Sequence, residues 1–282
     1  MQKGDVLADA RPVTQIWRGD FGQIEAYQLG VDPDRTDDVV VMIHAAGTGA
    51  QTLLPLAGML MRPGRSILIP HLDLYGETRI HRADDRPWRH GQVVHEALRR
   101  AGPMVRLIGH SVGGWACMRT LAFHDGAADR ALLIEPVALG AIQGPEDADA
   151  LAIDRRAVVS LQDRLAAHDP DAVADFITVW NGTDWTRLPE KARAALRALT
   201  TQIAGDCTET SFDTTPADAY RGIPCPVTLV GTERGPIPAL RILERLAPVL
   251  GTDVQIVAGQ NHMGPVMQPA AFLPVISRFL DD

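Results

Sequence analysis

The sequence contains few cysteines and has no long apolar run. Its three cysteines show no metal-ligand spacing, so we expect reduced thiols, no metal site and a cytoplasmic location. No apolar run approaches the roughly 18 residues that a membrane-spanning helix needs. Residues 1–9 contain no apolar core of a secretory signal, and the chain shows no repeat and no low-complexity tract. These absences favour a globular protein that does not enter a membrane.

The balance of charges narrows the classes of partner. The chain carries 35 Asp and Glu against 27 Lys and Arg, a formal net charge of −8 at pH 7. Because an acidic surface repels nucleic-acid phosphates and anionic membranes, we expect neither as the main partner. A length of 282 residues allows one large domain or a core with an insertion. The oligomeric state stays open, with a homodimer as one alternative.

One stretch, residues 104–115, combines an apolar run, a serine between glycines and the start of a helical segment. The run ends at Gly109-His-Ser-Val-Gly113, and an apolar segment rich in small residues follows up to Phe123. In this setting Gly-x-Ser-x-Gly is the nucleophile-elbow pattern, which predicts Ser111 in a strained turn above a sheet. The two glycines lack a Cβ, so the strand and the helix can approach closely.

The remaining chain alternates between strand and helix patterns. After a two-stranded hairpin at 13–29, apolar runs predict strands at 39–43, 66–69, 131–134, 227–230 and 253–257, and those at 39–43 and 227–230 are of the buried type. Helices are predicted at 51–61, at 87–100 (opened by Pro87), at 238–250 (stopped by Gly251) and at the end of the chain. Pro274 makes the last helix either start late or kink. The alternation indicates an α/β fold with a mostly parallel sheet covered by helices on both faces.

Residues 137–220 differ from the rest of the chain. They contain no buried-strand run, are rich in alanine and acidic residues, and show helical periodicity at 151–167, 170–180 and 189–203. We interpret this segment as a helical insertion. The predicted organisation is therefore a core formed by residues 1–136 and 221–282, with a cap formed by residues 137–220.

Five polar residues each follow a predicted strand, at the sheet edge where ligands of parallel sheets bind. They are His44, Ser111, Glu135, Glu233 and His262. A serine hydroxyl needs an adjacent base, and the base needs an orienting carboxylate. The order serine, acid, histidine along the chain predicts His262, in the loop after the last strand, as the general base. The other histidines fit this order less well, and His110, inside the elbow, is expected to pack locally.

An oxyanion hole needs two backbone donors aimed where negative charge develops. The N–H of Val112, directly after the nucleophile, is expected to be one of them. The loop after strand 39–43 is expected to supply the second, from Ala45 or Ala46, because small side chains let the backbone come close to a substrate. For this loop a plain glycine turn is the alternative.

Three segments together resemble the α/β-hydrolase superfamily over the whole chain: Gly109-His-Ser-Val-Gly-Gly114, His44-Ala-Ala-Gly47 and Asn261-His-Met-Gly-Pro265. The resemblance is to the capped, cofactor-free group that includes esterases, meta-cleavage C–C hydrolases and haloperoxidase-like proteins. It implies no metal and no organic cofactor. Haloalkane dehalogenases and epoxide hydrolases share the fold but use an aspartate nucleophile, so Ser111 argues against both.

The chain departs from the superfamily in two places. The usual His-Gly of the oxyanion loop is His44-Ala45, and Gly235 stands where many α/β-hydrolases have the acid, two residues beyond Glu233. We favour Glu135 as the acid, because it sits at a strand end and Pro136 should hold the chain extended there. Some haloalkane dehalogenases place a glutamate at this point, which supports Glu135 by analogy. Glu233 is the alternative, unless it forms a surface pair with Arg234.

By resemblance, the insertion 137–220 is a lid that excludes water from the site. Its residues Phe176, Trp180 and Trp185, together with His44 from the core, are expected to contact a small-molecule substrate. For the aromatic residues, the core of the lid itself is the alternative.

The function predicted from these patterns is a serine hydrolase. It would cleave an ester, a thioester or an activated C–C bond of a small to medium, partly apolar substrate. Two alternative functions are compatible with the same fold and the same residues. One is a cofactor-free lyase, cyclase or isomerase with His262 as base and no acyl-enzyme, and the other is a ligand-binding protein with a residual triad.

Overall fold

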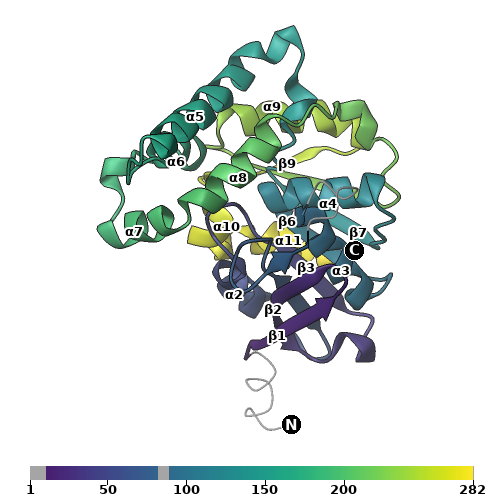
Figure 1. Cartoon of the computed structure of the whole chain (residues 1–282). Helices are drawn as coiled ribbons and strands as arrows, with labels where there is room; N and C mark the ends of the chain where they lie inside the picture. Colours follow the sequence, from purple (N-terminus) through teal and green to yellow (C-terminus); the bar gives the residue numbers. More distant parts are fainter. Residues whose placement is uncertain (1–10, 82–88, 282) are drawn as a thin grey trace.

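A single sheet lies at the centre of the protein (Figure 1). The computed structural model describes residues 11–81 and 89–281, and within them nine strands form this sheet. The strands are β1 (Val13–Gly19), β2 (Gly22–Gly30), β3 (Val39–Ile43), β4 (Ser66–Pro70), β5 (Arg79–Ile80), β6 (Arg106–His110), β7 (Arg130–Ile134), β8 (Val227–Thr232) and β9 (Val254–Val257). Their order is β1-β2-β4-β3-β6-β7-β8-β9, and β5 pairs with β2.

The sheet is parallel from β4 to β9 and antiparallel at its other end, where β1, β2 and β5 lie. Every residue of β3 and β4 is buried, as expected for strands covered on both faces. The predicted hairpin at 13–29 and the five further predicted strands are confirmed. β9, at the edge of the sheet, has no buried residue. Strand β5 was not predicted, because two residues are too few to show a periodicity.

Helices cover both faces of the sheet and form two separate apolar cores. The helices of the core are α2 (Leu54–Leu60), α3 (Arg89–Ala101), α4 (Val112–Phe123), α9 (Ile237–Leu250), α10 (Gly264–Met267) and α11 (Leu273–Asp281). Side chains of a strand alternate between the faces. Val41 of β3 therefore belongs to the cluster that contains residues of α3, α4 and α9, whereas Val40 and Met42 belong to the cluster that contains residues of α2 and α11. The predicted α/β fold is confirmed.

The helix boundaries differ from the predicted ones in detail. Pro87 lies outside the described residues, and the described part of α3 begins at Arg89. Pro274 is the second residue of α11, so that helix starts late and does not kink, because the first turn of a helix does not need the missing N–H. Gly251 ends α9 in the left-handed conformation, with φ 65°, as expected.

Four helices lie between β7 and β8 and gather at one side of the molecule (Figure 1). They are α5 (Ala148–Ala166), α6 (Ala174–Asn181), α7 (Glu190–Ala198) and α8 (Thr200–Ser211). The helix predicted at 189–203 is in fact two helices, which meet at Leu199. The segment 137–220 contains no strand and has an apolar cluster of its own, which includes Val158, Ile177 and Ile203. Its separation from the core as a cap stays a prediction.

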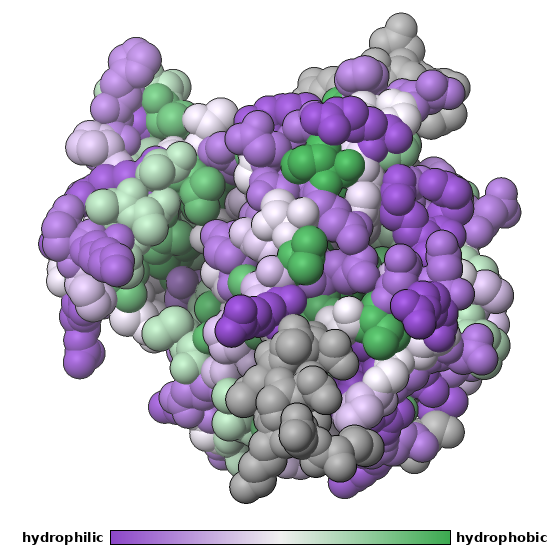
Figure 2. Space-filling view, turned by 90° about the horizontal axis from the view of Figure 1, so that it is seen from below, coloured by the Kyte–Doolittle hydropathy of each residue, from purple (hydrophilic) through white to green (hydrophobic). Residues whose placement is uncertain are grey.

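Short 3-10 helices complete the fold. They are η1 (Pro33–Arg35), η2 (Ala50–Leu53), η3 (Leu139–Ile142), η4 (Pro145–Asp147), η5 (Trp185–Arg187), η6 (Ala217–Tyr220) and η7 (Pro269–Phe272). On the face in Figure 2, hydrophilic residues predominate, and hydrophobic residues lie singly or in small groups. Such scattered apolar residues are normal for a protein surface. No helix within the described residues has both the length and the apolar character needed to cross a membrane.

Candidate active site

Ser111 occupies a sharp turn between β6 and α4. Its φ of 56° and ψ of −120° are rarely adopted by residues other than glycine, a strain that costs roughly 1–3 kcal/mol. A Cβ on Gly109 would lie 2.7 Å from the Cα of Gly114, and one on Gly113 would lie 2.5 Å from the carbonyl oxygen of His44. Both glycines are therefore needed for the close approach that the sequence predicts. The N–H of Ser111 donates to the carbonyl of Ile134 at 2.9 Å, which holds the turn against β7.

A buried chain of hydrogen bonds joins Ser111, His262 and Glu135. His262 Nδ1 lies 2.6 Å from Glu135 Oε2, and His262 Nε2 lies 3.0 Å from Ser111 Oγ. A carboxylate can only accept, so Nδ1 carries the proton of a neutral imidazole and Nε2 accepts from the serine hydroxyl. The exposed fractions of the three residues are 5%, 3% and 0%. The three residues that the sequence singles out thus lie within hydrogen-bonding reach of one another.

The Glu135 side chain is fixed by contacts on both of its oxygens. Oε1 accepts from the N–H and the hydroxyl of Thr232, at 2.7 and 2.5 Å, while Oε2 faces His262. The backbone at Glu135 is not extended as expected, because its φ is 42°. Its N–H donates to the carbonyl of Val230, so pairing with β8 overrides the preference imposed by the following proline. A Cβ at Gly235 would lie 2.4 Å from Glu135 Oε1.

Glu233, the alternative acid, points elsewhere. It is exposed, and its Oε2 accepts from the N–H of Gly259 at 2.6 Å. The guanidinium of Arg234 donates to the carbonyl of the same glycine. Both side chains therefore fasten the beginning of the loop that carries His262, and the carboxylate beside His262 belongs to Glu135.

The loop that carries His262 is held by residues from two other elements. His110 Nε2 donates to the backbone carbonyl of His262 at 2.8 Å, and the two rings are 5.0 Å apart. Burial, together with the nearby His262, holds the pKa of His110 well below its usual range, so this ring stays neutral. Asn261 donates to the carbonyl of Asn181 on α6. His110 packs locally as expected, and it also fixes the backbone of His262.

His44 lies against the loop at 45–49 and does not line the cavity, contrary to the expected substrate contact. Its ring is completely buried and both nitrogens are occupied. Nδ1 donates to the carbonyl of Ala45 at 2.8 Å, and Nε2 accepts from the N–H of Leu72 at 3.0 Å. Thr48 donates to the same Ala45 carbonyl at 2.7 Å. The ring thus orients a peptide group of the loop.

A cavity of about 510 Å³, counting its open mouth, reaches Ser111 and His262. Ala45, Ala46 and Val112 line it on the core side. Phe176 and Trp180 line it from α6, together with further residues of α5, α7 and α8, and their contact with a substrate stays a prediction. Trp185 does not line the cavity. It packs instead in the apolar cluster of the insertion, which was the alternative for the aromatic residues.

One buried residue in the cavity wall was not predicted. Asp154 on α5 accepts from Trp180 Nε1 at 3.0 Å and from the hydroxyl of Ser211 at 2.6 Å. Burial raises the pKa of Asp154. The sequence holds a signal for it, because Asp154 stands between Leu151 and Val158 on the apolar face of a predicted helix, where an acidic residue needs partners.

A model of the "Alpha/beta hydrolase family" matches residues 33–275 of the chain. The chain belongs to this family. The match spans the Ser111 turn, the segment between β7 and β8, and the loop of His262 in this alpha/beta hydrolase. No curated protein matches the chain in sequence.

Solved structures similar to this alpha/beta hydrolase share its fold at low sequence identity. The esterase RhEst1 from Rhodococcus sp. ECU1013 is 18% identical with a TM-score of 0.69, over 96% of this chain and 98% of that one. A carboxylesterase structure of Nitrososphaera gargenis is 16% identical with a TM-score of 0.68, over 95% and 98%. The bromoperoxidase from Bacillus anthracis is 16% identical with a TM-score of 0.65, over 96% and 100%.

We expect the buried His44 to make this alpha/beta hydrolase sensitive to acid. Burial lowers its pKa from 6.5 to about 3, so below pH 6.5 the unfolded chain binds a proton that the folded protein does not. The free energy of unfolding should therefore fall by about 1.4 kcal/mol per pH unit between pH 6 and 4 through His44 alone. Urea titrations from pH 7 to pH 4 would measure this slope. In His44→Gln, the fall in the free energy of unfolding per pH unit should be smaller by about 1.4 kcal/mol. An unchanged slope would show that His44 does not cause the acid sensitivity.

Proposed function

We propose that this protein is a serine hydrolase in which Ser111, His262 and Glu135 form the catalytic triad. The observation that carries the proposal is the continuous hydrogen-bond path, 3.0 Å from serine to histidine and 2.6 Å from histidine to glutamate. His262 takes the proton of Ser111 as Oγ attacks the carbonyl carbon, and then gives it to the leaving group. Glu135 stabilises the imidazolium that forms between these steps. Water, activated by His262, then releases the acyl group.

The N–H groups of Val112 and Ala46 are the oxyanion donors in this proposal. Val112 begins α4, where the helix N-terminus adds positive potential. His44 and Thr48 hold the carbonyl of Ala45. A trans peptide is planar, so the N–H of Ala46 points away from that carbonyl and from the ring beneath it. This geometry supports Ala46, rather than Ala45, as the second donor.

The segment 137–220 acts as a lid in this proposal. Residues of α5–α8 supply much of the cavity wall, including Phe176 and Trp180. Trp180 lies 5.1 Å from the ring of His262 and is held by Asp154, so it shields the base from water. A mainly apolar wall next to a nucleophilic serine favours a small to medium, partly apolar ester, thioester or activated C–C substrate.

Esterase and carboxylesterase neighbours support a carboxylesterase-like activity, although their likeness extends only to the fold. The cysteines Cys117, Cys207 and Cys225 are free thiols, which fits a cytoplasmic location. We propose a small molecule, rather than nucleic acid or a membrane, as the partner. A homodimer stays a prediction.

Replacing the nucleophile tests the proposal directly. Ser111→Ala should lose about 10³-fold or more in kcat/KM, with unchanged unfolding, because no other group supplies the attacking oxygen. A screen of short and long acyl esters, thioesters and vinylogous diketones would identify the substrate for this measurement. Ser160→Ala, a half-buried serine on α5, is the matched control and should retain full activity. Turnover that persists in Ser111→Ala would instead support a lyase or isomerase that uses His262 as base.

The identity of the acid can be tested by removing one charge at a time. Glu135→Gln keeps the size and the Thr232 contacts but loses the charge that stabilises the imidazolium, so kcat should fall about 10²- to 10⁴-fold. Glu233→Gln changes an exposed side chain whose partner is the Gly259 N–H, so kcat should stay within about threefold of the wild-type value. Steady-state kinetics on both variants decide the matter, and the opposite ranking would transfer the role to Glu233.

A further inference from the structure

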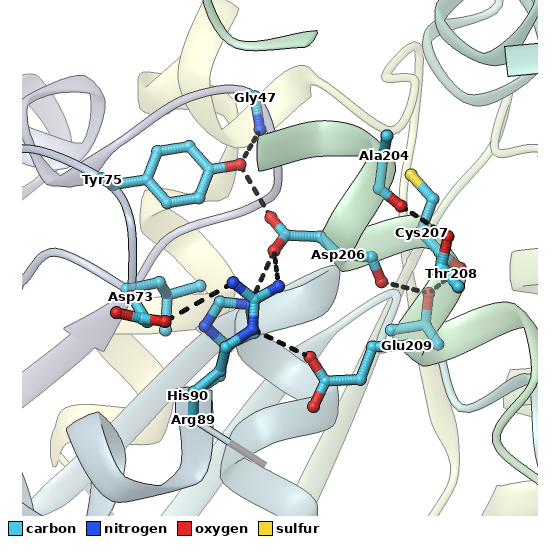
Figure 3. A network of polar contacts seen from close by, with 12 residues as sticks. Gly47, Asp73, Tyr75, Arg89, His90, Ala204, Asp206, Cys207, Thr208 and Glu209 are labelled. Carbon is cyan, nitrogen blue, oxygen red and sulfur yellow. Dashed lines mark hydrogen bonds and ion pairs between the residues drawn. The ribbon is translucent and has the colours of Figure 1, made fainter. Parts of the chain in front are cut away.

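Next to Gly47, polar side chains from three segments meet, and all of them except the half-buried Glu209 are buried (Figure 3). Tyr75 and Asp73 come from the loop between β4 and β5, Arg89 and His90 from α3, and Asp206 and Glu209 from α8. None of them lines the cavity around Ser111. The proposed mechanism therefore leaves this network without a role.

Tyr75 links the oxyanion loop to the insertion. The N–H of Gly47 donates to the Tyr75 hydroxyl at 2.8 Å, and that hydroxyl donates to Asp206 Oδ2 at 2.7 Å. The exposed fractions of Tyr75 and Asp206 are 2% and 0%. A hydroxyl has a single proton, so donation to Asp206 leaves its lone pairs for Gly47. The Asp206 carboxylate on α8 thereby orients the Tyr75 hydroxyl so that it accepts the hydrogen bond from Gly47.

Asp206 is in turn fixed by α3. His90 Nε2 lies 2.7 Å from Asp206 Oδ1, and Arg89 reaches the same oxygen at 3.4 Å. Arg89 also pairs with Glu209 at 3.5 Å, so its guanidinium joins two side chains of α8. A Cβ at Gly205 would lie 2.9 Å from Arg89, which means that the backbone of α8 lies directly against the guanidinium. These contacts therefore fix the position of α8 relative to α3.

The two peptide groups that flank Ala46 are held from opposite sides. His44 and Thr48 hold the carbonyl of the peptide before it, and Tyr75 holds the N–H of the peptide after it. Ile203 of α8 also packs on Gly47, where a Cβ would lie 3.1 Å from its Cδ1. The position of the Ala46 N–H therefore depends on α8 as well as on the core.

We propose that Tyr75 and Asp206 are positioning residues for the oxyanion donor at Ala46. The insertion would then be part of the catalytic apparatus, and not only a cover over it. This inference rests on the proposed role of Ser111 as nucleophile. Removal of the Tyr75 hydroxyl should weaken transition-state stabilisation, because a displaced Ala46 N–H no longer points at the developing negative charge.

Tyr75→Phe removes one oxygen and keeps the ring. Its kcat should fall about 10- to 100-fold with KM within about threefold, because a displaced donor loses part of the 10²- to 10³-fold effect of a deleted one. Tyr220→Phe is the matched control: that tyrosine is equally buried, contacts Phe123 and lies outside the cavity and the network. It should keep kcat.

A pair of substrates separates positioning from general damage. In a thionoester, sulfur replaces the carbonyl oxygen, and sulfur is larger and a weaker acceptor, so it gains less from the two donors. Tyr75→Phe should therefore lower the rate on an oxygen ester at least about fivefold more than the rate on the matching thionoester. An equal loss on both substrates, or an unchanged kcat, would overturn the inference.

Asp206→Asn gives a second route to the same answer. If Asp206 acts through Tyr75, this substitution should alter the ester-to-thionoester ratio in the wild-type background but hardly alter it in Tyr75→Phe. Additive effects in the double variant would overturn the inference. Where Tyr75→Phe folds poorly, an unchanged ester-to-thionoester ratio in Asp206→Asn alone would overturn it. Ser111→Ala separates the two proposals: if it keeps its activity the proposed function fails, whereas full loss there with an unchanged ratio in Tyr75→Phe refutes only the positioning role.

Discussion

The hydrogen bond between Glu135 and His262 joins two loops that are 127 residues apart, and the geometry around Ser111 depends on it. It fixes which nitrogen of His262 bears the proton, and so leaves the other nitrogen as an acceptor for the serine hydroxyl. The parallel pairing of β6 to β9 brings the loops together at one edge of the sheet. Burial makes loss of this hydrogen bond costly, because a carboxylate shielded from water depends on its protein partners alone.

The loop at 45–47, which we propose supplies an oxyanion donor, shows the converse situation. Ala45, Ala46 and Gly47 have almost no side chains, which lets a substrate come close but gives the loop few contacts of its own. Its conformation is therefore fixed from outside, by His44 and Thr48 on the core side and by Tyr75 behind it. Neighbouring elements supply the rigidity of this loop, and the insertion takes part through Asp206 of α8, which accepts a hydrogen bond from Tyr75.

Local patterns predicted the parts of the site that depend on a few consecutive residues. The Ser111 turn is visible in five positions, Glu135 directly follows an apolar strand, and His262 lies in the loop after the last strand. Contacts between distant segments gave no such signal. Trp180 and Trp185 are five residues apart on the same stretch, yet only the first faces the cavity, because the packing of α6 against α5 and α8 decides this and periodicity does not. The tyrosine–carboxylate contact behind the oxyanion loop spans 131 residues and was missed for the same reason.

The close contact between Gly235 and the Glu135 carboxylate constrains how this arrangement could change over time. A side chain there would collide with the carboxylate of Glu135, so the region beside His262 accepts an acid from the end of β7 or one from the loop after β8, but not both. A lineage that exchanged one arrangement for the other would have to alter both positions. Every single step would pass through a protein with two crowded carboxylates or with none. Positions 135 and 235 should therefore vary together among relatives of this chain, as one inherited unit.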